Sequence, residues 1–184
     1  MFELLVVQIE VDKIQIRVMA GYGPQENLDT DKRMPFFSAL EEEIVRAKVA
    51  NKSIIIQMDA NSKLGKEIIT EDPHEQSPNG AVLAAIVNRH ALTVVNSLRD
   101  RVTGLITRRR ITECGQEESI IDFLIFSDDL VENEKYMVID ENKKYALSVV
   151  RKSNRKINIT TSDHNVILTQ FKMEWRDSEK KERV

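Results

Sequence analysis

The segment Ser53–Asn61 restricts the possible folds of this chain more than any other stretch. Three consecutive isoleucines, Ile54–Ile56, form a short, continuous, β-branched apolar run, which is typical of a strand buried on both faces of a sheet. The run ends at Asp59 and Asn61, and loop-forming residues follow. If the strand persists to Asn61, the carboxylate and the carboxamide point the same way from one sheet edge. Such a pair can orient a water and hold a phosphate oxygen, or it can be an Asx-rich turn.

Strand-like and helix-like segments alternate along the rest of the chain. The expected strands are Glu3–Val11 and Ile14–Met19 as a hairpin, Ile54–Asn61, Leu92–Val95, Ser119–Ser127, a hairpin of Tyr136–Ile139 with Tyr145–Val150, and a strand from Thr160–Leu168 to about Trp175. The expected helices are Pro35–Val49 and Ala81–Asn88, the second after a cap at Asn79. The loop Ser62–Asn79 holds His74, which is most simply a solvated histidine. The alternation predicts an α/β layered domain with helices outside the sheet.

Length and composition limit the other possibilities. The 184 residues suffice for one domain, expected over residues 1–175 with a charged tail at 176–184, and 41% hydrophobic residues exclude a disordered chain. The net charge of −3 gives no global basic field, so a nucleic-acid surface would have to be local. The single cysteine indicates a reducing compartment, and no apolar run approaches the ~20 residues of a membrane span. We therefore expect an intracellular protein, nuclear or cytoplasmic, with no membrane partner.

One carboxylate interrupts the apolar segment Ser119–Ser127, at Asp122. An ionised carboxylate in such a strand is costly unless a partner holds it. No neighbour in the sequence can pair with it, so the partner is expected from a distant segment, and a histidine would be suitable. Asp163 and His164 lie at the mouth of the last expected strand.

Two local clusters of basic residues stand out. Arg108, Arg109 and Arg110 follow one another, and a second cluster contains Arg151, Lys152 and Arg155. Three adjacent arginines are usually a solvated edge strand, but they also suit phosphate contacts at the rim of an active site. Both clusters are therefore candidate nucleic-acid-binding surfaces.

Four short motifs, taken together, resemble those of the endonuclease/exonuclease/phosphatase superfamily. They are Tyr22-Gly23-Pro24, Met58-Asp59-Ala60-Asn61, Ser119-Ile120-Ile121-Asp122-Phe123 and Ser162-Asp163-His164. Within the superfamily, the chain looks most like the apurinic-type endonuclease domains of non-LTR retrotransposons, which accompany a reverse transcriptase. The resemblance implies a four-layer α/β sandwich of two packed sheets and metal-dependent hydrolysis of phosphodiesters.

The resemblance also implies a role for each motif residue. Asp59 would orient or deprotonate the attacking water, and Asn61 would hydrogen-bond that water or a non-bridging oxygen. His164 would stabilise the phosphate as a charged donor, with its ring oriented by Asp122.

Further roles concern the metal and the substrate. Asp163 would lie at a Mg²⁺ (or Mn²⁺) site, because hard carboxylate oxygens suit these ions. Tyr22 would donate its hydroxyl to the phosphate, although a buried tyrosine beside a Gly-Pro turn is also common. The implied partner is nucleic acid, with DNA as the first choice over RNA.

The chain departs from the family pattern at its start. The family's domain begins with a strand that carries an asparagine and a strand–helix unit that carries a metal-binding glutamate. Glu3 and Glu10 lie in the first hairpin instead, so neither takes that role. We therefore expect an N-terminally truncated domain that cleaves weakly or not at all on its own. Unpaired sheet edges would then favour a homodimer.

Three functions remain open at this point. The first is a metal-dependent nuclease, whole or truncated. The second is a catalytically inactive derivative that serves as a nucleic-acid-binding or assembly domain. The third is a small-molecule phosphatase of the same superfamily, which the two basic clusters disfavour because they suit a polyanion.

Overall fold

The computed structural model describes residues 2–11, 13–145, 148–153 and 156–171, and all structural statements below concern these residues. The strands are β1 (Glu3–Val11), β2 (Ile14–Tyr22), β3 (Ser53–Asp59), β4 (Leu92–Val94), β5 (Val102–Thr103), β6 (Arg108–Thr112), β7 (Gly115–Ser119), β8 (Asp122–Ser127), β9 (Glu134–Ile139), β10 (Ser148–Ser153), β11 (Lys156–Thr161) and β12 (Ile167–Phe171). The helices are α1 (Thr30–Val49), α2 (Pro78–Arg89), the single turn α3 (Asp128–Val131) and a 3₁₀ turn, Val95–Ser97.

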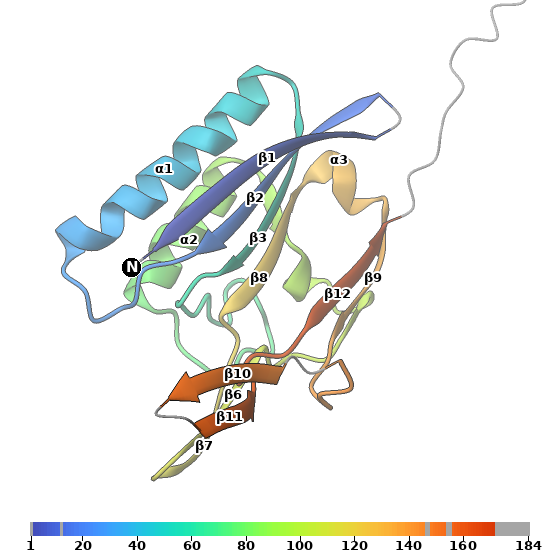
Figure 1. The fold of residues 1–184 in the computed structure, drawn as a ribbon. Helices are drawn as coiled ribbons and strands as arrows, with labels where there is room; N and C mark the ends of the chain where they lie inside the picture. The colour runs from blue at the N-terminus through green and yellow to red at the C-terminus, as the bar shows by residue number, and fades with distance from the viewer. Residues whose placement is uncertain (1, 12, 146–147, 154–155, 172–184) are drawn as a thin grey trace, which may run out of the picture.

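The largest sheet has the strand order β1-β2-β3-β8-β4. Strands β2 and β3 are parallel and are joined through α1, while β1 pairs antiparallel with β2 and β8 pairs antiparallel with β3 and β4. Helices α1 and α2 lie on one face of this sheet, and the smaller sheet β12-β9-β5 lies on the other side (Figure 1). The described residues thus form three layers of the predicted α/β sandwich: helices, sheet and sheet.

Strand β3 is buried on both faces, as its isoleucines predict. Ile54 and Ile56 belong to the core that packs under α1, together with Phe37 and Leu40 of that helix. Ile55 points to the opposite face, into the smaller core between the two sheets. Because both cores meet at β3, the end of this strand is held rigidly.

Two helix boundaries differ from the prediction. Helix α1 begins at Thr30, so Pro35 lies inside the helix rather than at its start. The cap of α2 is Ser77, whose hydroxyl accepts a hydrogen bond from the Gly80 N–H, so the predicted cap at Asn79 is wrong. Serine is as good a cap as asparagine, and proline at the first helical position, here Pro78, marks the true start.

Two strand predictions also need correction. The predicted pairing of Tyr136–Ile139 with Tyr145–Val150 is wrong, because β9 pairs with β12 and β5, and β10 pairs with β11. Lys143, with φ of 56°, turns the chain away from β9. The predicted strand Ser119–Ser127 is divided between β7, which pairs with β6, and β8 in the large sheet.

Strand β1 is at the edge of the large sheet and is apolar on both faces. Leu4 and Val6 pack against the core under α1. The alternate side chains of β1, from Leu5 to Val11, are exposed on the opposite face. Among the described residues, no helix is both long and apolar enough to cross a membrane.

Candidate active site

Two carboxylates meet because of the pairing register of the large sheet. Asp59, the last residue of β3, lies directly opposite Asp122, the first residue of β8. Tyr22, the last residue of β2, continues the same row on the other side of Asp59. Residues paired across a sheet project from the same face, so all three side chains enter one groove of about 620 Å³. His164 also lines this groove.

The distant partner predicted for Asp122 is His164, and the predicted hydrogen bond between them is confirmed. The Nδ1 atom of His164 lies 3.0 Å from each carboxylate oxygen of Asp122. The same ring places Nε2 3.8 Å from Oδ2 of Asp59. The hydrogen bond to Asp122 raises the pKa of His164 against the effect of burial, and the charges of Asp122, Asp59 and Asp163 add to the rise. The geometry therefore favours an imidazolium with Nε2–H directed into the groove.

Asp59 is held in an environment that disfavours its charge. Burial raises the pKa of Asp59, and the neighbouring carboxylate of Asp122 raises it further. The backbone N–H of Asn61, 3.0 Å from Oδ1, opposes these effects, as do the charges of His164 and Arg108. A carboxylate with a raised pKa is a better proton acceptor, which is the chemistry required of a general base.

Asn61 reaches the site by a turn and not by continuation of the strand. Strand β3 ends at Asp59, and Asn61 has a φ of 46°, so the expectation that the strand persists to Asn61 is wrong. Its Nδ2 donates to the carbonyl of Gly23 at 2.9 Å, and the residue lines a groove beside the one that holds Asp59, Asp122 and His164. Gly23 allows this approach, because a Cβ there would lie 2.5 Å from the Ala60 carbonyl oxygen. The Tyr22-Gly23-Pro24 motif thus fixes both Tyr22 and Asn61.

Three residues that the sequence did not indicate hold the segments of Asp122 and His164 in place. The Thr107 hydroxyl accepts from the backbone N–H groups of Ile121 and Asp122, at 2.9 and 3.0 Å. The Asn96 side chain bonds the backbone on both sides of Phe123, donating to the Asp122 carbonyl and accepting from the Leu124 N–H.

The third such residue is Lys143, whose ammonium donates to the carbonyls of Ser162 and His164, at 2.9 and 2.7 Å. Each of these contacts joins segments far apart in the sequence, so no local pattern reveals it.

Asp163 lies beside the histidine but outside the group of donor atoms that converge. Its carboxylate accepts from Nε of Arg108 at 2.8 Å. Burial opposes its charge, but the hydrogen bond and the charge of Arg108 prevail and lower the pKa of Asp163. The role of metal ligand thus has better candidates than Asp163.

Among the described residues, Asp59, Asp122 and His164 are the ones whose ligand atoms converge, all within 4.8 Å of one another. We call these three residues the carboxylate–histidine cluster. Mg²⁺ and Mn²⁺ prefer hard oxygen ligands, and Mg²⁺ is commonly held by one or two carboxylates and several waters. The two carboxylates fit such an ion, with Asp59 the freer of the two because Asp122 already accepts from His164.

The remaining candidate residues divide into three groups. Tyr22 is 42% exposed in the groove, and its hydroxyl makes no hydrogen bond to the described residues, so it is not the buried tyrosine that the sequence also allowed. Arg108 and Arg110 line a second groove next to the first. Arg109 points away from both grooves and donates to Glu118 and to the Glu141 carbonyl.

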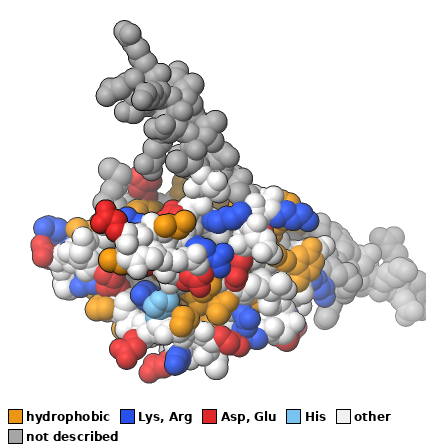
Figure 2. All heavy atoms as spheres, turned by 90° about the horizontal axis from the view of Figure 1, so that it is seen from below, with side chains coloured by type: hydrophobic (Ala, Val, Ile, Leu, Met, Phe, Trp, Pro, Cys, Tyr) orange, Lys and Arg blue, Asp and Glu red, His pale blue; other side chains and the backbone are white. Residues whose placement is uncertain are grey.

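The second basic cluster is described in part. Arg151 and Lys152 lie on β10, which pairs with β11, and only their backbone positions are given. Arg155 lies outside the described residues. Figure 1 shows β10 and β11 at the same end of the molecule as the β6–β7 hairpin. Viewed from this end, the described surface carries acidic and basic side chains side by side, so positive charge there is local (Figure 2).

The chain as a whole is similar to solved nucleases and phosphatases. It matches the endonuclease domain of TRAS1, a telomere-specific non-LTR retrotransposon, with a TM-score of 0.60 and 17% identity over 94% of this chain and 64% of that one. It matches the 3′ phosphatase NExo from Neisseria, bound to a product DNA hairpin, with a TM-score of 0.60 and 19% identity over 91% and 65%. It matches a mannosyl-6-phosphatase of Bacteroides thetaiotaomicron with a TM-score of 0.55 and 13% identity over 88% and 52%.

The chain therefore spans about two thirds or less of the length of these structures. No protein-family model and no curated protein sequence matches it.

Proposed function

We propose, on the premise that this chain has the fold of the endonuclease/exonuclease/phosphatase superfamily, that it hydrolyses phosphodiester bonds in nucleic acid. The observation that carries the proposal is the carboxylate–histidine cluster, which converges at the ends of β3 and β8 in an open groove. An imidazolium, a poorly solvated carboxylate and a nearby carboxamide are the groups that in-line attack of water on a phosphodiester needs.

Each residue has a role that follows from its contacts. Asp59 accepts a proton from the attacking water as its oxygen bonds to phosphorus. His164 donates Nε2–H to a non-bridging oxygen and offsets the charge that builds up there. Asn61, fixed by Gly23, orients the water or a second phosphate oxygen. The bond to the leaving oxygen breaks, and solvent supplies the proton that this oxygen needs.

A divalent ion would be held by Asp59 and Asp122, within the ligand distances described above. When bound, Mg²⁺ or Mn²⁺ would neutralise phosphate charge and help the leaving oxygen. Asp122 would keep its second task, the orientation of His164, through Nδ1. Tyr22, which lines the groove, would donate its hydroxyl to the phosphate.

The choice of nucleic acid rests on the basic residues and on the relatives. Arg108 and Arg110 stand beside the cluster, where they suit a polyanion. The TRAS1 domain is an endonuclease of a retrotransposon, and the NExo structure contains DNA. We take DNA as the first substrate to test, which would place the chain in the nucleus or cytoplasm.

A cleavage assay tests the proposal. The purified chain is incubated with supercoiled plasmid, an abasic duplex and a small phosphomonoester, in Mg²⁺, in Mn²⁺ and in EDTA. We expect metal-dependent cutting of DNA that falls at least 100-fold in both Asp59→Ala and His164→Ala. Cutting that persists in both variants would identify a contaminant. DNA binding without cutting would favour the inactive derivative, and turnover of the phosphomonoester alone would favour a phosphatase.

A further inference from the structure

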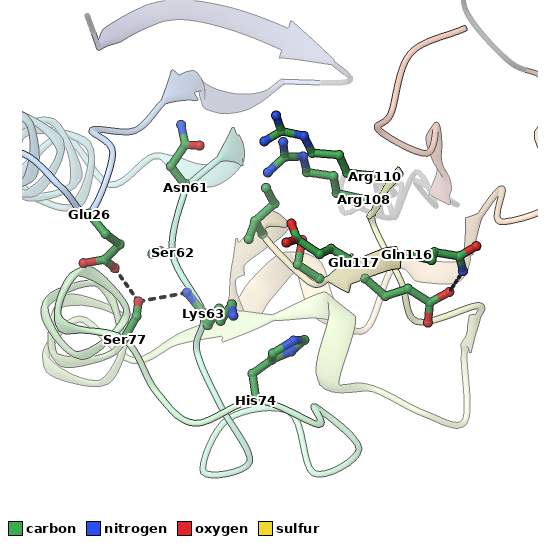
Figure 3. Close-up of a pocket in the computed structure, with 13 residues that line it drawn as sticks. Glu26, Asn61, Ser62, Lys63, His74, Ser77, Arg108, Arg110, Gln116 and Glu117 are labelled. Atoms are coloured by element: carbon green, nitrogen blue, oxygen red, sulfur yellow. Dashed lines mark hydrogen bonds between the residues drawn. The ribbon is translucent and has the colours of Figure 1, made fainter. Parts of the chain in front are cut away.

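A second groove, of about 670 Å³, lies beside the active-site groove. Two residues connect them: Asn61, whose N–H bonds Asp59, and Arg108, whose Nε bonds Asp163. The walls of the second groove come from the loop after β3, the segment before α2 and the β6–β7 hairpin (Figure 3). None of the candidate catalytic groups except Asn61 faces it.

Cationic side chains of this groove are left with unused donors. Lys63 and Arg110 line it and make no side-chain hydrogen bond or ion pair to the described residues. Arg108 uses Nε for Asp163, while its two terminal nitrogens make no further hydrogen bond there. A groove that gathers free guanidinium and ammonium groups suits an anionic ligand.

A buried hydroxyl points to the same conclusion. Ser62 lines the groove with only 1% of its surface exposed, and its Oγ has no hydrogen-bond partner among the described residues. Buried polar groups are nearly always hydrogen-bonded, so an unpartnered one in a groove indicates a missing acceptor or donor. A phosphate oxygen would accept from this hydroxyl.

His74 adds a third element, which its sequence context did not suggest. The Oδ1 atom of the fully buried Asp72 lies 3.0 Å from the His74 N–H and 3.1 Å from Nδ1. Oδ2 of the same carboxylate accepts from the Gly65 N–H. The ring points into the groove, with Nε2 without a partner in the described part of the chain (Figure 3). His74 thus lies in a loop with its side chain 26% exposed, as expected, and Asp72 in addition fixes the orientation of its ring.

The acidic residues of the groove are mostly neutralised. Glu26 accepts from the Ser77 hydroxyl, from the Asn79 N–H at 3.0 Å and from Arg33. Glu118 accepts from Arg109 on the outer side of the hairpin.

Glu117 is the exception, because it is exposed opposite Arg110 and makes no ion pair with the described residues. Its carboxylate would repel a bound anion. Removing the charge of Glu117 and removing a positive charge of the groove should therefore change the affinity in opposite directions.

We infer that the second groove binds a second phosphate of the strand whose phosphodiester the carboxylate–histidine cluster attacks. The inference rests on the proposed function and narrows its substrate to a nucleic-acid strand with at least two phosphates in sequence. A small phosphate ester would occupy the first groove alone.

Binding in EDTA tests the inference separately from catalysis. Fluorescence anisotropy measures the affinity of the chain for a labelled single strand and a labelled duplex over a range of salt. We expect Lys63→Gln and Arg110→Gln each to weaken binding about three- to tenfold and to lower the salt slope by about one. Glu117→Gln should tighten binding. Arg46→Gln, on the exposed face of α1, removes the same charge elsewhere and should change neither quantity.

The alternatives have distinct outcomes. No binding to either oligonucleotide, or equal losses in Arg46→Gln and Lys63→Gln, would overturn the inference. Binding with the expected pattern but without hydrolysis would remove the proposed function and leave the second groove as a binding site. If an oligonucleotide and bis(p-nitrophenyl) phosphate are both hydrolysed, and Lys63→Gln and Arg110→Gln alter neither rate, the proposed function stands and the second groove is not a phosphate site.

Discussion

Asp122 and His164 form the contact on which the proposed chemistry of the site depends. The carboxylate begins a strand of the large sheet, and the histidine comes from a turn held by Lys143. Their hydrogen bond satisfies a buried charge and, in the same step, sets the tautomer and the charge of the ring. This one contact therefore explains why β8 can contain a carboxylate and why the Nε2–H of His164 is directed into the groove as a donor.

The pH dependence of His164 follows from this contact. Because the folded-state pKa of His164 is raised, its pairing with Asp122 stabilises the fold fully below the unfolded pKa of about 6.5. That contribution is lost as the pH rises through the higher folded pKa. Asp122→Asn should lower the pKa of His164 and remove this part of the pH dependence. NMR titration of the His164 Cε1–H signal in EDTA, in the unchanged protein and in Asp122→Asn, measures it.

A His164 signal that titrates at the same pH in both proteins would contradict the role of Asp122. If Asp122→Asn loses cleavage while the pKa of His164 stays the same, that role is also contradicted. Asp122 would then not act through the charge of the His164 ring.

Asp59 should stabilise the fold less than an uncharged residue of its shape. Burial and the charge of Asp122 raise its pKa, so ionisation of Asp59 at neutral pH destabilises the native state. Asp59→Asn keeps the acceptor for the Asn61 N–H and should raise the free energy of unfolding in EDTA by a few tenths to about 1 kcal/mol, while it abolishes cleavage. Urea unfolding of both proteins at pH 7 measures this. A less stable Asp59→Asn would mean that the carboxylate has a structural role.

At the scale of single residues, the sequence predicted the contact that a large energetic cost requires. It did not predict side-chain positions that depend only on the three-dimensional arrangement. Asp122 was assigned a distant histidine because an unpaired buried carboxylate is so unfavourable. No such constraint applies to Asn61, whose left-handed turn replaces the expected strand, or to Asp163, which Arg108 engages.

Helix α2 packs on the loop that connects the two grooves, and Gly80 makes the contact. A Cβ at Gly80 would overlap the carbonyl oxygen of Lys63. Glycine to alanine in a helix normally stabilises by about 1 kcal/mol, but here Gly80→Ala should destabilise by roughly 1–3 kcal/mol because backbone has to move. Chemical denaturation measures the difference, and Ala85→Gly on the exposed side of α2 calibrates the propensity term.

If Gly80→Ala is neutral or stabilising, α2 can shift away from the loop. In that case oligonucleotide binding in the second groove should also be unchanged in this variant, whereas a rigid contact predicts that both quantities change together.

Helices and strands with a regular pattern of apolar residues were predicted well. Strand pairs whose members lie far apart in the sequence were not. Strands β1, β2 and β3 and the body of α1 follow from their apolar patterns. The pairing of β9 with β12, across 25 or more residues, left no local signal, so the nearer β10 was the apparent partner.

The layers of the whole molecule follow from the same alternation of elements. The helices bury one face of the large sheet and the second sheet buries the other, and the active-site groove lies at the strand ends where these layers meet. The resemblance to the superfamily came from four short motifs, and the match to solved structures at 17–19% identity agrees with it for the fold. The end of the molecule shown in Figure 2 carries acidic and basic side chains side by side, so the positive charge of the second groove is local, in keeping with a net charge of −3.

The edge strand β1 leads to a prediction for the assembly. Its outer backbone groups have no strand partner among the described residues, and Leu5, Val7, Ile9 and Val11 form an apolar row on one face, with Leu5 64% exposed. Such an edge is a template for another strand. We expect two copies to pair antiparallel through β1, because a two-fold axis there pairs the two edges and brings the two apolar rows side by side on one face of the joined sheet.

Sedimentation velocity over a range of concentrations tests the homodimer. Val7→Lys and Ile9→Lys place a charge in the row and should weaken self-association at least tenfold, since lysine on an edge strand blocks pairing. Val49→Lys, at the 84% exposed end of α1, adds the same charge away from β1 and should leave the dimer intact. A monomer at every concentration, or a dimer that Val7→Lys and Ile9→Lys leave unchanged, would exclude pairing through β1. Oligonucleotide binding measured on the same variants tests whether dimerisation and nucleic-acid binding are coupled. Leu5 would connect the two, because it belongs to the apolar row of β1 and also lines the active-site groove.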